Sequence, residues 1–526
     1  MTATATAPAP TPTEPQVGNP LRRRLLRESA ASLLRTTSGA FLVLLVPPVL
    51  IRQLGPTTYG AWAIAVEVGT YLGLLDLGAL SAVGHFAAKH RDAVDGTGRV
   101  MSTLLALQLA SIAAGAALLA ALVALVPVVY PKLPAELVPS ARLTLALVGG
   151  SSLLGLLATT CTGYFLSVGR LVVPSSITFA SRLVGTGLVI VFASWGLGLG
   201  PLAAAWAGTS VLGYLVIGVA FRRLRVPVRR SLVDRTVGRE MVSFSSAYGI
   251  WILAGLLVVG LDTTIVARID FGGVAAFAAA AGAVSIVNAV YSSALAPLVP
   301  VAADLDAAGR RADLTELLLR ITRLGGTAVV LGGAALALLA DPVLTAWVGA
   351  ETAAVGVPIL RALVAGNVLR LVVMPYPVML FGTGEHRRIR STPVLEGVVN
   401  VAASIALGLA YGPTGVALGT LVGAAVGLAA HAFVNVPRTR SLDLTGAGFV
   451  RRGLGGPLLA ALPVVVVVAA ADAWPAGWWW PLAAAAWTAT AVACWTVALT
   501  SAERRALSAR VRRRGTTPAD PARVPT

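Results

Sequence analysis

The chain has 526 residues, of which 56% are hydrophobic and only 12% are charged, and its mean hydropathy is +0.82. This composition excludes an ordinary soluble protein and indicates an integral membrane protein. The net charge of +18 does not indicate nucleic-acid binding, because the arginines form short clusters between apolar blocks.

In chain order, residues 1–20 are a Pro/Thr/Ala-rich tract that we expect to be disordered, and the apolar segment after RRRLLR at 22–27 is too long for a cleaved signal peptide. The basic tail at 503–526 is also expected to be disordered. The apolar blocks between the two tails predict an all-α protein with fourteen spans, at about 32–52, 58–80, 101–126, 142–166, 171–194, 198–220, 242–266, 274–298, 322–346, 355–380, 391–410, 413–435, 454–471 and 478–500.

The distribution of basic residues supports an even number of spans. With the N-terminus placed in the cytoplasm, 33 of the 41 lysines and arginines fall in inside segments. The exceptions are Arg35, Arg52, Lys132, Arg142, Arg182, Arg268, Arg361 and Arg370. A missed span would move every later loop to the opposite side of the membrane and spoil this agreement. We therefore expect a cytoplasmic-membrane protein with both termini in the cytoplasm.

Three pairs of short segments suggest an internal repeat, at offsets of 218, 215 and 212 residues. They are LGPTTYGAWA at 54–63 with DFGGVAAFAA at 270–279, SVGR at 167–170 with GTGEHR at 382–387, and LGPLAAAW at 199–206 with YGPTGVAL at 411–418. Repeats of six spans share one orientation, related by an axis along the membrane normal. We therefore expect a six-helix lobe at 21–230, a second at 231–440, and two additional spans at 441–502.

These segments also resemble a known family. LGPTTYGAWA, followed by LLDLGALSAVGHFAAKH at 74–90, is similar to the opening of polysaccharide-biosynthesis membrane proteins of the Wzx type, which export lipid-linked oligosaccharides. GLDTTIVARIDFGGVAAFAAA at 260–280 and GTGEHRRIRSTPVLEGVVNVAAS at 382–404 continue the likeness. The resemblance implies the multidrug/oligosaccharidyl-lipid/polysaccharide exporter superfamily. Its fold is similar to that of MATE exporters and lipid II flippases, with two lobes around a cavity that opens alternately to each side.

Ionisable residues inside spans are functional candidates by default. Arg182 lies too deep to reach an interface, and its guanidinium suits a diphosphate because it forks onto two oxygens; a structural ion pair is the alternative. Arg370, in the span predicted at 355–380, is a second candidate for the same phosphate-binding role. Arg35 either reaches the headgroups from the cytoplasmic end of the first span or meets an anionic headgroup at the entrance. Glu67 is a candidate counter-charge to either deep arginine, or a proton carrier.

A second set of candidates involves ion coupling. Glu396 and Asn400 are one helical turn apart and share a face, and with Asp262 they offer oxygen ligands for Na⁺ or a site for proton exchange. The resemblance supports this set, because lipid II flippases place a cation site between the corresponding helices. Since Asp262 is predicted near the outer end of its span and Glu396 near the inner end of another, one shared site would require a distorted helix.

We therefore expect a secondary transporter rather than an enzyme, which flips an anionic lipid-linked glycan by alternating access. Membrane lipids and polysaccharide-assembly proteins are the expected partners, with no nucleic acid. No catalytic residue, metal site or cofactor is predicted, since the histidines show no metal spacing and no GxxxxGK[ST] motif occurs. The alternatives are a MATE-type drug/cation antiporter, a membrane-embedded glycosyltransferase and a transport-inactive scaffold.

Overall fold

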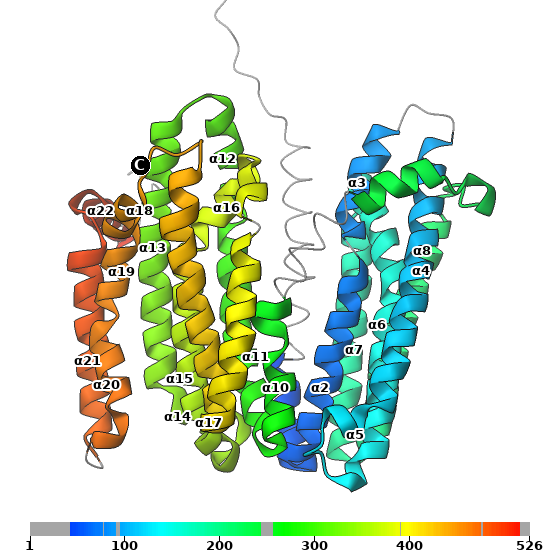
Figure 1. The fold of residues 1–526 in the computed structure, drawn as a ribbon, viewed down its shortest axis with the longest axis horizontal. Helices are drawn as coiled ribbons and strands as arrows, with labels where there is room; N and C mark the ends of the chain where they lie inside the picture. Colours follow the sequence, from blue (N-terminus) through cyan, green and yellow to red (C-terminus); the bar gives the residue numbers. More distant parts are fainter. Residues whose placement is uncertain are drawn as a thin grey trace, which may run out of the picture.

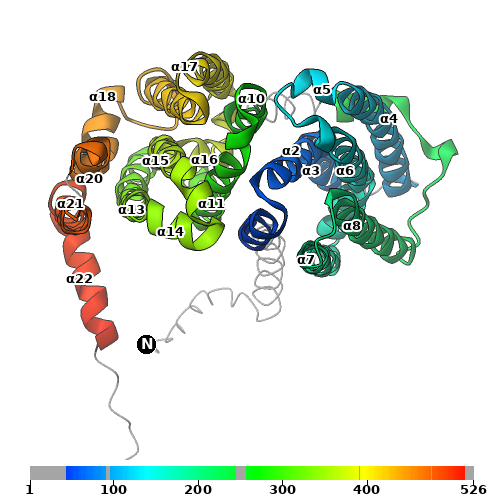
Figure 2. The same cartoon turned by 90° about the horizontal axis from the view of Figure 1, so that it is seen from below.

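The computed structural model describes residues 43–515, except 77, 91–94, 244–255, 390 and 475–476. The elements in this part of the chain are all helical. Figure 1 shows the helices standing roughly parallel in two groups, with the C-terminal helices beside the second group. Figure 2, seen along the helices, places the C-terminal helices on the side of the second group away from the first.

The first helix group comes from the first half of the chain. It comprises a helix over Val43–Leu54, α2 (Pro56–Gly73), α3 (Ala79–Lys89), α4 (Gly96–Ala124), α5 (Val126–Val129), α6 (Val138–Ser167), α7 (Val172–Ser194) and α8 (Leu199–Arg222).

The second helix group follows, and the C-terminal helices complete the described chain. The second group comprises α10 (Asp262–Ile269), α11 (Val274–Leu295), α12 (Leu298–Ala307), α13 (Arg311–Leu338), α14 (Ala340–Val348), α15 (Ala350–Val373), α16 (Pro375–Gly382) and α17 (Ser391–Ala429). The C-terminal helices are α18 (Gly446–Phe449), α19 (Gly455–Ala460), α20 (Leu462–Ala469), α21 (Trp479–Ala493) and α22 (Ser501–Gly515).

Glycine and proline set several helix boundaries. Gly55 has a φ of 85°, which places it in the left-handed region, and Pro56 then begins α2 with a φ suited to a first turn. The long helix α17 is interrupted at Gly412, whose φ is 62° and ψ −146°, directly before Pro413. The kink turns the chain back on itself within one apolar region, so that its two arms pack together.

The described residues contain nine helices that are long and apolar enough to cross a membrane, or ten if the bent pair Gly446–Ala460 and Leu462–Ala469 forms one span. The chain is thus an all-helical, multi-pass membrane protein. The number is lower than fourteen partly because residues 385–438, which cover two of the predicted spans, count once despite the kink. Fourteen spans therefore stays a prediction.

The hydrophobic core shows how the two groups meet. One cluster of buried side chains crosses between them and includes Trp62 and Tyr59 of α2 with Phe277 of α11. Two further clusters lie within single groups, one around Phe86 in the first and one around Tyr376 in the second. Within the described residues, the groups therefore share a core at one end and have separate cores toward the other.

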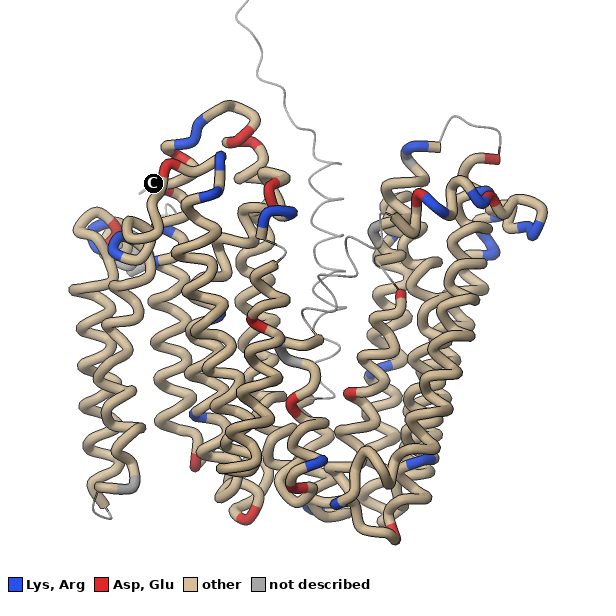
Figure 3. The backbone as a smooth tube through the Cα atoms, in the orientation of Figure 1, with Lys and Arg blue, Asp and Glu red and all other residues tan. Residues whose placement is uncertain are grey.

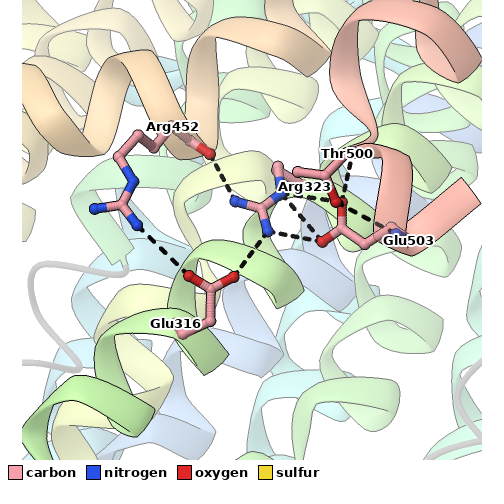
Figure 4. Close-up of polar contacts among 5 residues, drawn as sticks. All are labelled: Glu316, Arg323, Arg452, Thr500 and Glu503. Carbon is pink, nitrogen blue, oxygen red and sulfur yellow. Dashed lines mark hydrogen bonds and ion pairs between the residues drawn. The ribbon is translucent and has the colours of Figure 1, made fainter.

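The C-terminal helices are fastened to the second group by a buried ion pair (Figure 4). Arg323 of α13 donates from Nη2 to Glu503 at 2.7 Å and from Nη1 to the backbone oxygen of Arg452 at 2.9 Å. Glu503 also accepts hydrogen bonds from the backbone N–H and hydroxyl of Thr500, while its own N–H donates to that hydroxyl. This is a capping box, which starts α22.

The prediction that the whole of 503–526 is disordered is therefore wrong for residues 503–515, which form most of α22. The physical reason is local, because the capping box satisfies the first backbone N–H groups of the helix and the Arg323 ion pair fixes its start. Residues 1–42 and 516–526 lie outside the described residues.

Candidate functional site

A cavity of about 590 Å³ lies inside the first helix group, between α2, α6, α7 and α8. Nine of its lining side chains carry a hydroxyl group, contributed by all four of these helices. Arg182 is the charged residue among the described residues that line it. The cavity is therefore polar, rich in hydroxyl groups, and positively rather than negatively charged.

Arg182 occupies the middle of α7, as predicted, and its side chain meets the cavity rather than only lipid. Close packing of α7 on α8 places it there. A side-chain carbon on Gly213 would come within 2.2 Å of Ser181 Oγ, and one on Gly185 within 2.6 Å of Thr209 Oγ1. The charge of Arg182 also acts on Tyr214, which lines the same cavity. Small residues thus bring the two helices together beside the arginine.

The hydroxyl groups keep part of their hydrogen-bonding capacity. Thr70, Ser152, Thr159 and Thr162 each donate to a backbone carbonyl one turn earlier in the same helix, at 2.8–3.2 Å. These bonds use the hydroxyl proton and leave the oxygen lone pairs as acceptors. Such a lining can accept hydrogen bonds from the hydroxyl groups of a sugar, while the arginine can donate to phosphate oxygens.

A second polar site lies inside the second helix group, around Asp262 at the start of α10. Thr420 Oγ1 donates to Asp262 Oδ2 at 2.8 Å, Asn400 Nδ2 donates to Oδ1 at 3.3 Å, and Ser404 Oγ lies 3.5 Å from the same oxygen. All four side chains are buried. Asn400 and Ser404 belong to one arm of α17 and Thr420 to the other, so the kink at Gly412 assembles the site.

A helix distortion lies next to Asp262, although the shared site with Glu396 for which the sequence analysis required one is not formed. Residues Leu256–Gly260 form a π-helical turn that ends two residues before Asp262, and Asn400 also donates to the backbone oxygen of Leu257 at 3.2 Å. Such turns are frequent at functional sites. The two arms of α17 approach closely, because a side chain on Gly419 would come within 2.3 Å of the Ser404 backbone. Within the described residues, no three His, Cys, Asp or Glu side chains gather as a metal-binding group.

Glu396 is not part of the Asp262 cluster. Its carboxylate accepts a hydrogen bond from Nε of Arg370 at 2.8 Å, so two residues predicted in separate sites form one ion pair between α15 and α17. The Arg370 charge also acts on Asp262, which places the pair beside the cluster. Arg370 Nη2 is buried and has no hydrogen-bond partner among the described residues.

Glu67 lies between the two helix groups rather than in the cavity. It accepts a hydrogen bond from the hydroxyl of Tyr71, one turn further along α2, and its carboxyl group lies near the side chain of Thr263 in α10. Thr263 follows Asp262 directly, so the structure brings Glu67 to the Asp262 site and not to Arg182. The remaining candidate, Arg35, lies outside the described residues.

Sequence reasoning missed Ser404 and Thr420. Ser404 could have been found, because it follows Asn400 by four residues and lies on the same helical face. Thr420 gave no comparable signal, since its approach to Asp262 depends on how α17 bends.

The two helix groups are also joined by polar contacts to backbone oxygens. Arg52 Nη2 donates to the backbone oxygen of Ala346 at 2.7 Å, and Trp347 Nε1 donates to that of Leu44 at 2.8 Å. Arg268 Nη1 lies 3.2 Å from Val128 O and 3.3 Å from Val129 O. Arg52 and Arg268, which are among the basic residues predicted outside the inside segments, thus form hydrogen bonds between the two helix groups.

The fold is similar to those of known transport proteins. The lipid II flippase MurJ, in its inward closed conformation, matches with a TM-score of 0.69 and 13% identity over 89% of this chain and 98% of that one. A multidrug resistance MATE family transporter of the MOP superfamily, in its inward-facing conformation, matches with a TM-score of 0.60 and 16% identity over 77% and 95%. A MATE protein in the straight conformation matches with a TM-score of 0.54 and 18% identity, over 78% of this chain and 94% of that one.

At these identities the likeness shows the fold alone, which is of the kind seen in lipid II flippase MurJ and MATE transporters. No protein-family model matches the sequence, and no curated protein matches it either.

Proposed function

We propose that this protein is a flippase or exporter that moves a lipid-linked oligosaccharide of the polyprenyl-diphosphate type across the cytoplasmic membrane. The product would serve assembly of a surface polysaccharide or cell wall, in contact with polysaccharide-assembly proteins. The proposed arrangement has fourteen spans in two six-helix lobes plus two C-terminal helices, with both termini in the cytoplasm. The lobes would rock about the bound headgroup while the lipid tail stays in the bilayer.

The hydroxyl-rich cavity with Arg182 carries this proposal. A drug/cation antiporter needs acidic groups where its substrate binds, whereas the charge in this cavity is positive. A diphosphate matches the fork of a guanidinium, and a glycan matches many hydroxyl oxygens. Arg370 would reach the headgroup only in a state in which its ion pair with Glu396 has opened.

The Asp262 cluster is proposed as the ion-coupling site. It offers one carboxylate with the neutral oxygens of Asn400, Ser404 and Thr420, and the backbone oxygen of Val416 accepts from Ser404 at 3.1 Å. Hard oxygen ligands with a single negative charge suit Na⁺, and the same carboxylate could instead carry H⁺. The contact of Glu67 with Thr263 would connect this site to the boundary between the helix groups.

The test uses purified protein in liposomes, with a fluorescent polyprenyl-diphosphate oligosaccharide added to one leaflet. Movement to the other leaflet is scored by protection from a membrane-impermeant quencher, and ethidium uptake is measured in parallel. We expect protein-dependent movement of the lipid-linked glycan and none of ethidium. Ethidium transport without glycan movement would overturn the proposal in favour of an antiporter.

A further inference from the structure

The segment that joins the two helix groups carries an unusual concentration of arginines. This basic linker, residues 222–239, contains seven arginines, all exposed: Arg222, Arg223, Arg225, Arg229, Arg230, Arg235 and Arg239. Its one acidic residue, Asp234, already pairs with Arg99 at 3.4 Å, and the next residue, Glu240, pairs with Lys89. The positive charge of the linker is therefore not neutralised by its own acidic residues.

The linker is fastened along the side of α4. The backbone N–H of Arg229 donates to Ser102 Oγ at 3.0 Å, and that of Asp234 donates to Thr103 Oγ1 at 2.9 Å. A side chain on Gly98 would come within 2.5 Å of the backbone oxygen of Pro227, so the contact needs glycine there. Figure 2 shows the chain passing around the outer side of α4 and α8.

These contacts fix the depth of the linker relative to the membrane. The apolar stretch of α4 runs from Leu104 to Ala124, which at about 1.5 Å per residue spans about 31 Å and matches a hydrocarbon core of about 30 Å. Ser102 and Thr103 come directly before this stretch. The linker thus lies at the level where hydrocarbon meets headgroups, at the end where Figure 3 shows most basic residues.

The exposed side chains of the linker include both apolar and positively charged residues, as expected at the boundary between hydrocarbon and headgroups. Val237 is buried against the protein, whereas Val228 and Val233 are 42% and 41% exposed and sit among the exposed arginines. Exposed valines next to arginines are expected where acyl chains and phosphates are both within reach. A surface that binds a soluble acidic protein would have no such reason to expose them beside the end of a span.

We propose that the basic linker is a binding surface for anionic phospholipid headgroups, held by the forked guanidinium groups of its arginines with Val228 and Val233 against the acyl chains. Guanidinium groups bind phosphate bidentately and remain charged at any physiological pH. The occupant is a bilayer lipid and not the transported molecule, so this inference stands apart from the proposed function.

The experiment uses the full chain in nanodiscs of phosphatidylcholine with increasing phosphatidylglycerol. Native mass spectrometry then counts the phosphatidylglycerol molecules retained by the released protein. The test variant is R225Q/R229Q/R230Q. The control, R311Q/R320Q/R387Q, removes the same charge from exposed arginines of the second helix group.

We expect the linker variant to bind phosphatidylglycerol roughly 100-fold more weakly, because each arginine at an anionic surface contributes roughly fivefold. The control should change binding only a few-fold. An equal loss in both variants, or none in the linker variant, would overturn the proposal. The proposal would also be overturned if soluble polyglutamate competed with the lipid for the wild-type protein at equal affinity. That result would indicate an acidic protein partner.

A variant with R225K/R229K/R230K guards against misfolding, because it keeps the charge while losing the fork. It should elute as the wild type does in size-exclusion chromatography and bind phosphatidylglycerol more tightly than the glutamine variant. Binding of the lysine variant that is as weak as that of the glutamine variant would contradict a charge-driven headgroup site.

Discussion

Arg370 of α15 donates from Nε to the carboxylate of Glu396 in α17 at 2.8 Å, and this pair lies beside the Asp262 cluster. The side chains are only 20% and 10% exposed. Desolvating two charges costs free energy that is recovered only while both partners remain, so removal of either one leaves an uncompensated charge. The pair therefore connects α15 to α17 at the point where α17 contributes Asn400 to the cluster.

We predict that R370M and E396L each destabilise the protein by about 2–3 kcal/mol, while the double variant R370M/E396L loses about 1 kcal/mol or less. Thermal unfolding in detergent, followed by intrinsic fluorescence, measures both effects. A double variant that loses as much as the sum of the single variants would show that the two residues do not act as a pair.

Arg182 is predicted to affect transport. R182A removes the positive charge of the hydroxyl-rich cavity, and the loss of a bidentate contact to a diphosphate should lower the flipping rate at least tenfold. The control is R170A, which removes an exposed arginine just before the same helix. Equal rates for R182A and the wild type in the liposome assay would remove Arg182 from the substrate site.

Asp262 is predicted to make stability depend on Na⁺ or H⁺. If Na⁺ binds the folded protein at this cluster, adding Na⁺ should raise the unfolding temperature of the wild type, and D262N should abolish that rise. The matched control is D270N, which alters an exposed carboxylate that accepts a hydrogen bond from the backbone of Gly272. A wild type indifferent to Na⁺, but with transport driven by a pH gradient that D262N abolishes, would assign the site to H⁺.

Much of the helix pattern could be predicted from the sequence, because the lengths of apolar stretches and the clusters of arginine are local properties. For this reason the predicted span 142–166 falls within α6, and the predicted span 198–220 falls within α8 except for its first residue. Helix α22 was missed because its arginine-rich composition favours disorder, although the Thr500–Glu503 capping box was visible at its start. Six-helix lobes and their boundaries remain predictions.

The candidate site could be predicted only in part. Arg182 was identified from its depth in an apolar segment, which the sequence shows directly. The pairing of Arg370 with Glu396 could not be foreseen, because it depends on the rotation of two neighbouring helices about their axes. Thr420 joins Asp262 across 158 residues through the bend at Gly412. These are tertiary contacts, and a single sequence shows only which residue types are available to form them.

The ion pair of Arg323 and Glu503 is predicted to make the attachment of α22 sensitive to acid. Burial opposes ionisation of Glu503, but hydrogen bonds from Arg323 and Thr500 outweigh it and hold the pKa of this carboxyl below its usual value. Because the folded pKa is lower than the unfolded one, the stabilisation is complete above about pH 4.3 and is lost as pH falls through the folded value.

We therefore expect E503Q to be less stable than the wild type at pH 7, by about 2–3 kcal/mol, with the difference shrinking as the pH falls below about 4.3. Thermal unfolding of both proteins across this range measures it. E316Q is the control, because Glu316 is 58% exposed and its pairs with Arg323 and Arg452 should contribute little. A difference between E503Q and wild type that stays constant with pH would contradict this account.

The last prediction concerns the hydrogen bonds that join the two helix groups. The proposed alternating access would require the groups to separate where Arg52 meets Ala346 and Arg268 meets Val128. Because a hydrogen bond from a charged donor contributes about 1.5 kcal/mol or more, R52A and R268A should each shift the ratio of separated to joined states about tenfold. Spin labels at Lys132 and Glu351 report the distance between the groups by electron resonance.

The control for this shift is R142A. Arg142 Nη2 also donates to a backbone oxygen, that of Ala124 at 2.8 Å, but both residues belong to the first helix group. Its loss should leave the distance distribution unchanged, because the bond is present in both states and contributes no difference between them. If R142A shifts the distribution as strongly as R52A, the effect arises from loosening of the helices in general and not from separation of the two groups.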